Sequence, residues 1–156
     1  MKMIKILVPI FILLSFTVAS CAPETLTIDV SATQLSDTIL DEYTFPAMYE
    51  VPTDELLAEF GISDEHFSEV SAYTTEEPYG IERVFFAIVK DGESIENAKT
   101  ELTAYFDMIK GQSANYDPVE FAKAENASVY SNGNLLALVI CEDSDGALNK
   151  VKELIK

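Results

Sequence analysis

The sequence predicts an α+β fold: an antiparallel sheet of four to five strands, built from two hairpin-like strand pairs plus an edge strand and packed with about five helices. Three observations predict this class. Segments with the two-residue period of strands alternate with segments that have helical spacing. The two clearest strand pairs are joined by short, turn-rich connections, which favours antiparallel pairing. No repeat or long linker interrupts residues 26–156, so this range is expected to be a single domain.

The first predicted elements lie within residues 26–61. Alternating apolar residues predict the edge strand over residues 26–30. Ser31 and Gln34 have capping-box spacing, and the helix that they begin is expected to end near residue 43. Thr53 is expected to cap a short helix over residues 54–60, which ends at Gly61.

The middle of the chain predicts the first strand pair, over residues 70–74 and 84–89, with a turn-rich segment between them. A long amphipathic helix follows over residues 94–110, and Gly111 is expected to end it. Asp117 then has the position of a helix cap before a first-turn proline, so a short helix is expected to run to about residue 124.

The last elements are a hairpin and a helix. Segments 128–130 and 135–141 flank Asn132-Gly133, which is a strong hairpin signal. Ser144 is expected to cap the final helix. Strands 84–89 and 135–141 are apolar on both faces, so the second face of the sheet must be covered. Another of the predicted helices is favoured over a partner protein or a ligand as the cover.

The amino terminus has the layout of a signal peptide over residues 1–20. Lys2 and Lys5 precede the apolar run 6–16, which is too short for a typical spanning helix. The next residues, Val18-Ala19-Ser20-Cys21, resemble the lipobox of bacterial lipoproteins. This resemblance implies that Cys21 carries a diacylglyceryl group and becomes the first residue of a protein anchored at the outer, extracytoplasmic face of the cell membrane. Residues 21–25 would then be a short tether. An ordinary secreted protein is the alternative.

Lipidation of Cys21 would leave Cys141 without a partner, so no disulfide is expected. Cys141 ends an apolar run and is followed by acidic residues, which disfavour a thiolate. It is therefore interpreted as a small buried apolar residue.

Several segments together resemble domain-of-unknown-function family 4358, a family of small bacterial lipoproteins found mostly in Gram-positive Firmicutes. The matching features are the lipobox at Cys21, a first helix ending near Phe45, Leu-Leu-x-x-Phe-Gly-Ile at 56–62, the strand 84–90, the long helix from Ser94, Tyr116-Asp117-Pro118, and Gly133-Asn134-Leu135-Leu136. The last strand of the family often begins with Gly-x-Tyr, where this chain has Leu135. The resemblance implies a fold and a location, and no catalytic residue.

Charge excludes one class of partner. The chain has 27 acidic and 10 basic residues and a formal net charge of −17, so it lacks the basic surface that nucleic acids require. It also lacks a basic cluster for anionic lipid heads. Association with the membrane would therefore depend on the amino terminus.

The residues predict neither a catalytic constellation nor a cofactor or metal site. His66 is the only histidine and is expected in a solvated or capping role on a surface turn. Asp143-Ser144-Asp145-Gly146 lacks the spacing of a calcium loop and is better explained as a helix start. Carboxylate pairs such as Glu76-Glu77 are too abundant to mark a glycosidase.

These observations favour a binding or protein-interaction module, with an unknown protein of the cell envelope as a possible partner. Tyr73, Tyr79 and Tyr130 are the candidate interaction surface, because aromatic side chains are enriched at interfaces. The alternatives are a small hydrolase that uses carboxylates alone, and a structural surface protein with weak binding of divalent cations.

Overall fold

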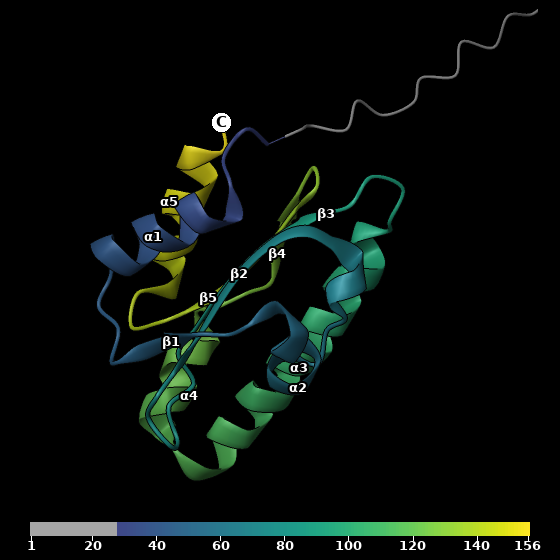
Figure 1. Ribbon diagram of the computed structural model, residues 1–156. Coiled ribbons are helices and arrows are strands. Elements are labelled where there is room, and N and C mark those ends of the chain that lie inside the picture. Colours follow the sequence, from purple (N-terminus) through teal and green to yellow (C-terminus); the bar gives the residue numbers. More distant parts are fainter. Residues whose placement is uncertain (1–27) are drawn as a thin grey trace, which may run out of the picture.

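A computed structural model describes residues 28–156 as one antiparallel sheet with helices packed on both faces (Figure 1). The predicted signal peptide 1–20, the lipidation site Cys21, the tether 21–25 and the first two residues of the predicted edge strand lie outside the described residues.

The sheet of the described region has five strands in the order β1-β2-β3-β5-β4, and all neighbouring strands are antiparallel. The strands are β1 (Met48–Glu50), β2 (Phe67–Thr75), β3 (Arg83–Val89), β4 (Tyr130–Asn132) and β5 (Leu135–Ile140). This arrangement confirms the predicted α+β class and both hairpin-like pairs. The first strand of the second pair lies at 130–132 and not at the predicted 128–130, and pairing of Asn132 with Leu135 makes Gly133 and Asn134 the turn, one residue later than the predicted Asn132-Gly133. Gly133 has a φ of 56°, a conformation that glycine adopts without steric cost.

Residues 28–156 form five α helices, which agrees with the number predicted. They are α1 (Ala32–Glu42), α2 (Leu56–Phe60), α3 (Ile95–Tyr116), α4 (Pro118–Glu125) and α5 (Ser144–Leu154). The capping box that begins α1 is complete: the Ser31 hydroxyl accepts from the Gln34 backbone N–H, and the Gln34 side chain accepts from the Ser31 N–H. Gly61 ends α2 with a φ of 63°.

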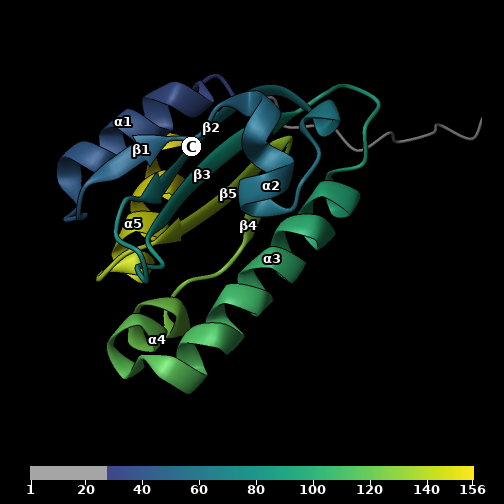
Figure 2. The same cartoon turned by 60° about the horizontal axis from the view of Figure 1, so that its bottom comes forward.

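Two hydrophobic cores lie on opposite faces of the central strand β3. Phe85 and Ala87 pack under α2, α3 and α4, whereas Val84 and Phe86 pack under α1 and α5 (Figure 2). The two-residue period of a strand sends these side chains alternately to the two faces. Helices α1 and α5 therefore cover the second apolar face, the cover that the sequence favours.

The predicted edge strand over residues 26–30 is wrong in its described part, because residues 28–30 are in no strand. Ile28 and Val30 are half-buried and pack against the core under α1 and α5. Their alternation therefore reflects packing of two side chains against the core from a segment that is not part of the sheet. The edge strand of the sheet is instead β1, which pairs with the end of β2.

Helix α3 continues six residues beyond the predicted end at 110 and includes Gly111. Gly111 is exposed, and a Cβ at this position would have no atom within 4 Å. The buried face of the helix continues through Ile109 to Ser113, so tertiary packing outweighs the low helix propensity of one glycine.

Two predicted helix caps also differ. Asp143, and not Ser144, caps α5 by accepting the Gly146 N–H, and Ser144 is the first helical residue. Thr53 belongs to a short 3-10 turn that precedes α2 and makes no side-chain cap. The Ser144 side chain is buried, and its hydroxyl links the end of β5 to α4 through the carbonyl oxygens of Cys141 and Lys123.

Candidate functional site

A groove runs along the end of the sheet where the β2–β3 loop meets the junction of α3 and α4. It consists of two adjoining cavities of about 560 and 430 Å³. The two cavities share Pro78, Tyr79, Gly80, Asp117 and Glu120. We call them the arginine half, around Arg83, and the acidic half, around Glu82 and Lys123. This end of the molecule lies opposite the first described residues, which Figure 1 shows in purple.

Arg83 lines the first cavity and is the only arginine in the sequence. Its Nε donates to the Tyr105 hydroxyl at 2.8 Å, and Nη1 donates to the carbonyl oxygens of Glu82 at 2.8 Å and Gly80 at 3.4 Å. Among residues 28–156, no carboxylate lies within 4.0 Å of the guanidinium, and Nη2 has no hydrogen-bond partner. The guanidinium is thus oriented by neutral acceptors and makes no direct ion pair with a described residue, although Asp117 and Glu120 also line this cavity.

Helix α3 and the β2–β3 loop form the walls of the arginine half. Ile109, Gln112 and Tyr116 line it from α3, and the last two lie beyond the predicted end of that helix. Tyr79 and Tyr116 are 89% and 88% exposed. Exposed rings beside a cleft provide apolar contact area with a polar end, which suits recognition of a ligand.

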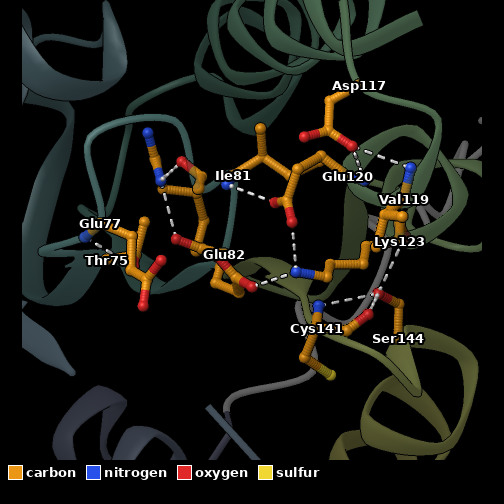
Figure 3. Close-up of polar contacts among 12 residues, drawn as sticks. Thr75, Glu77, Ile81, Glu82, Asp117, Val119, Glu120, Lys123, Cys141 and Ser144 are labelled. Atoms are coloured by element: carbon orange, nitrogen blue, oxygen red, sulfur yellow. Dashed lines mark hydrogen bonds and ion pairs between the residues drawn. The ribbon is translucent and has the colours of Figure 1, made fainter. Parts of the chain in front are cut away.

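A three-residue network lies in the acidic half (Figure 3). Lys123 Nζ donates to Glu82 Oε1 at 2.5 Å and to Glu120 Oε1 at 2.6 Å. Burial by itself lowers the pKa of Lys123, but the hydrogen bonds and charges of Glu120 and Glu82 outweigh it, so the pKa is raised above its ordinary value. Lys123 is therefore a fixed cation that holds two carboxylates together.

The start of α4 places this network. The Asp117 carboxylate caps the helix by accepting the N–H groups of Val119 and Glu120. The Glu120 side chain is then free to accept the Ile81 N–H at 3.0 Å through Oε2. From the other side, the Ser144 hydroxyl accepts the Cys141 N–H and donates to the carbonyl oxygens of Cys141 and Lys123. Helix α4 is thereby tied to the β2–β3 loop and to the end of β5.

One oxygen of this network has no partner. The Glu82 side chain is 7% exposed, and its Oε2 is buried without a hydrogen bond to the described residues. Gly80 lies directly beside it, since a Cβ on Gly80 would lie 2.8 Å from this oxygen. A buried carboxylate oxygen without a donor is unfavourable.

The structure does not bring the three predicted interaction tyrosines together. Tyr79 lines both cavities, whereas Tyr73 and Tyr130 are half-buried against the core under α1 and α5. The Lys152 Nζ also lies 5.5 Å from the centre of the Tyr130 ring. Tyr79 is therefore the only one of the three on the groove.

The other residues weighed from the sequence lie outside the groove. His66 is 18% exposed and lies between two carboxylates, with Nδ1 3.6 Å from Glu93 and Nε2 3.3 Å from Glu101. Cys141 is 1% exposed, and burial raises the pKa of its thiol. Within residues 28–156, no group of three or more His, Cys, Asp or Glu side chains is arranged to hold a metal ion. No helix of that range is both long and apolar enough to cross a membrane.

Sequence reasoning missed Arg83, Glu82, Lys123 and Tyr116 as site residues. One signal was available for Arg83: it is a single arginine in a chain with 27 acidic residues. No sequence signal marks Glu82 or Lys123, because the contact between them joins residues 41 positions apart.

The fold and the groove define a small α+β domain in which an arginine without an ion-pair partner among residues 28–156 and a carboxylate-lysine network line adjoining cavities. A family model described as a domain of unknown function, DUF4358, matches residues 41–141, and the chain belongs to that family. The match includes both strand pairs and every residue of the carboxylate-lysine network. Comparisons with curated proteins and with solved structures gave no match.

Proposed function

We propose that this protein is a lipid-anchored extracytoplasmic binding module whose ligand presents a carboxylate or a similar anionic group to Arg83. The observation that carries the proposal is the environment of Arg83, the only arginine in a strongly acidic chain, which has no carboxylate partner among the described residues. Guanidinium groups bind planar anions through paired hydrogen bonds, and Nη2 is available to make one.

Preorganisation supports binding at this position. The hydrogen bonds of Nε and Nη1 fix the plane of the guanidinium before a ligand arrives, so little side-chain entropy is lost on binding. The exposed rings of Tyr79 and Tyr116 add apolar contact area beside it. A cavity of about 560 Å³ is within the range that small-molecule sites occupy.

The position of the groove is consistent with a membrane anchor. The lipobox-like segment ending at Cys21 motivates the anchor, and only six residues separate Cys21 from Ile28. A connection of that length spans at most about 25 Å between Cys21 and Ile28 when it is fully extended. The β2–β3 loop and the α3–α4 junction, which line the groove, lie at the end of the domain away from the first described residues, drawn in purple (Figure 1), so an anchored domain can hold its groove away from the bilayer.

The binding proposal is tested by titrating the protein with short alkanoates and following backbone and arginine side-chain resonances. Saturable shifts are expected at Arg83 and at the walls of the arginine half. Arg83→Gln should lower the affinity about tenfold or more, since a hydrogen bond to a charged group contributes about 1.5–3 kcal/mol. Lys99→Gln removes the same charge from a part of α3 that does not line the groove, and it should bind like the wild type. Equal losses in both variants would contradict a specific site.

The anchor is tested separately by Cys21→Ala. The variant should leave the membrane fraction, and mass spectrometry of the wild-type protein should find a diacylglyceryl adduct on Cys21. Retention of the variant on washed membranes, or a plain thiol on the native residue, would contradict the anchor and leave the binding proposal unaffected.

A small hydrolase that uses carboxylates is the alternative. Glu82 and Glu120 are adjacent to Lys123, but the two Glu120 oxygens already accept hydrogen bonds. Steady hydrolysis of a bound ligand that is abolished by Glu82→Gln would favour the enzyme over the binding module.

A further inference from the structure

The anion proposed as the ligand of Arg83 occupies the arginine half of the groove, and the acidic half is an adjoining cavity with its own charged residues. We propose that the acidic half binds a primary ammonium or guanidinium group through Glu82, so that the ligand of the groove is dipolar, with an anionic end on Arg83 and a cationic end at Glu82. The anionic end rests on the proposed function, and the cationic end rests on separate observations.

The first observation is the balance of charge. Lys123 is the one cation among the lining residues of the acidic half, and it faces an excess of carboxylates. The acidic lining residues are Glu77, Glu82, Asp117, Glu120 and Glu142. In the arginine half, Arg83 faces only Asp117 and Glu120, so the larger excess of negative charge lies in the acidic half, which is the half that attracts a cation.

The second observation shows which carboxylate has unused capacity. Asp117 caps α4, and Glu120 accepts from Ile81 and Lys123. Glu82 accepts from Lys123 through Oε1 alone, while its Oε2 is buried and has no donor among the described residues. An ammonium or guanidinium donor would supply the hydrogen bond that Oε2 lacks.

The third observation is the access to that oxygen. Gly80 packs against the buried Glu82 Oε2 and also lines the part of the groove that both halves share. A Cβ at position 80 would lie 2.8 Å from Oε2 and 2.7 Å from Thr75 Cγ2. The φ of Gly80 is not positive, so its small size, and not an unusual backbone conformation, is what the site uses. The terminal torsion of a glutamate is broad, so Oε2 can turn toward a donor beside Gly80, and this turn also shifts Oε1 relative to Lys123 Nζ.

The remaining walls suit an organic cation better than a metal ion. Phe45 and Tyr79 line the acidic half and can place ring faces beside a positive charge. A divalent ion needs several oxygen ligands, and the described residues provide no such cluster. The two halves adjoin along the loop Pro78–Gly80 and at Asp117 and Glu120, which line both of them. A single short molecule can therefore reach both charges.

The test uses short ω-amino acids as dipolar probes, with the alkylamine and the alkanoate of equal chain length as single-charge probes. The side-chain carboxyl resonance of Glu82 and the side-chain resonances of Lys123 and Arg83 are followed at physiological ionic strength, which screens diffuse attraction to the acidic surface. The alkylamine should shift the Glu82 resonance saturably. At the best-fitting length, the ω-amino acid should bind about tenfold or more tightly than either single-charge probe.

Variants distinguish specific binding of the alkylamine at Glu82 from diffuse attraction of a cation to the acidic surface. Glu82→Gln should weaken binding of the alkylamine about tenfold or more, because it removes a charge-assisted hydrogen bond. Glu125→Gln, at an exposed position on the same helix as Lys123, should leave the affinity unchanged. Gly80→Ala should weaken the alkylamine more than the alkanoate. Should Glu82→Gln fail to fold, the wild-type titration and Gly80→Ala still decide the question.

The outcomes are distinguishable. An alkylamine that shifts no resonance of the acidic half, or equal losses in Glu82→Gln and Glu125→Gln, would overturn the cationic end. Should the alkanoate still bind at Arg83 in that case, the proposed function would stand. Saturable binding of the amine at Glu82 without any binding of the alkanoate would support the cationic end and overturn the anion site at Arg83.

Discussion

The apolar part of β3 and the two polar residues just before it differ in how fully their side chains are packed and partnered. Val84 and Phe86 are fully buried under α1 and α5, in a core that apolar side chains close completely. The two residues just before Val84 are Glu82, which has a buried oxygen without a hydrogen bond, and Arg83, which has no ion-pair partner among the described residues. Apolar side chains at these two positions would have continued the alternation of β3 and packed this end of the sheet as well. The α1/α5 face is closed by apolar packing, whereas the groove keeps a buried oxygen without a donor, a cost that a ligand would offset under the proposed function.

The largest effect should follow from breaking the apolar side. Phe86→Ala should lower the free energy of unfolding by about 3–5 kcal/mol, since it removes a fully buried ring and leaves a cavity. Chemical denaturation measures this change. Met108→Ala, at a side chain that is 51% exposed, should stay within about 0.5 kcal/mol of the wild type. A loss as small for Phe86 as for Met108 would contradict the packed second face.

A smaller loss should follow from breaking the network in the groove. Lys123→Met should destabilise the protein by about 2–3 kcal/mol, because Glu82 and Glu120 would then face each other without a cation. The double variant Lys123→Met with Glu82→Gln should recover part of the loss. Additive losses in the double variant, measured by the same denaturation, would show that the two side chains are not coupled.

The network also predicts a pH dependence. Because the folded-state pKa of Lys123 is raised, its contribution to stability is complete below the ordinary lysine pKa and is lost as the pH rises through the folded-state value. Denaturation at increasing alkaline pH should therefore cost the wild type more stability than Lys123→Met. An identical alkaline loss in both proteins would contradict this role.

The smallest predicted effect is a gain. Gly111→Ala should stabilise the protein by about 0.5–1 kcal/mol, since an exposed glycine inside α3 has unoccupied space around it and alanine favours the helix. Thermal or chemical denaturation measures the gain. A loss would indicate that α3 ends near residue 110, and the wall of the groove at Tyr116 would then be misplaced.

Local signals predicted much of this fold. The capping box at Ser31, the glycine at Gly61 and the hairpin at Gly133 each depend on neighbouring residues, and each is present. The three-residue strand β1 was missed because it has too few residues to show a period, and only its pairing with β2 defines it.

The groove could not be predicted because it depends on distant contacts. Glu120 has capping-box spacing from Asp117, yet its side chain bonds to Ile81 and Lys123. The sequence predicted that α3 ends at Gly111 because glycine has a low helix propensity. Burial on the other face of the helix instead extends it to Tyr116. Only the folded chain brings Arg83 beneath these elements, so the best sequence clue was that arginine occurs once.

The most direct test of the central claim is a crystal structure of the protein with a short alkanoate. The proposed function predicts the carboxylate on Arg83, with Nη2 as a donor, while the bonds from Nε to Tyr105 and from Nη1 to the Glu82 carbonyl persist. An empty arginine half at saturating alkanoate, with the Arg83 guanidinium paired instead to a carboxylate of its own chain, would contradict it.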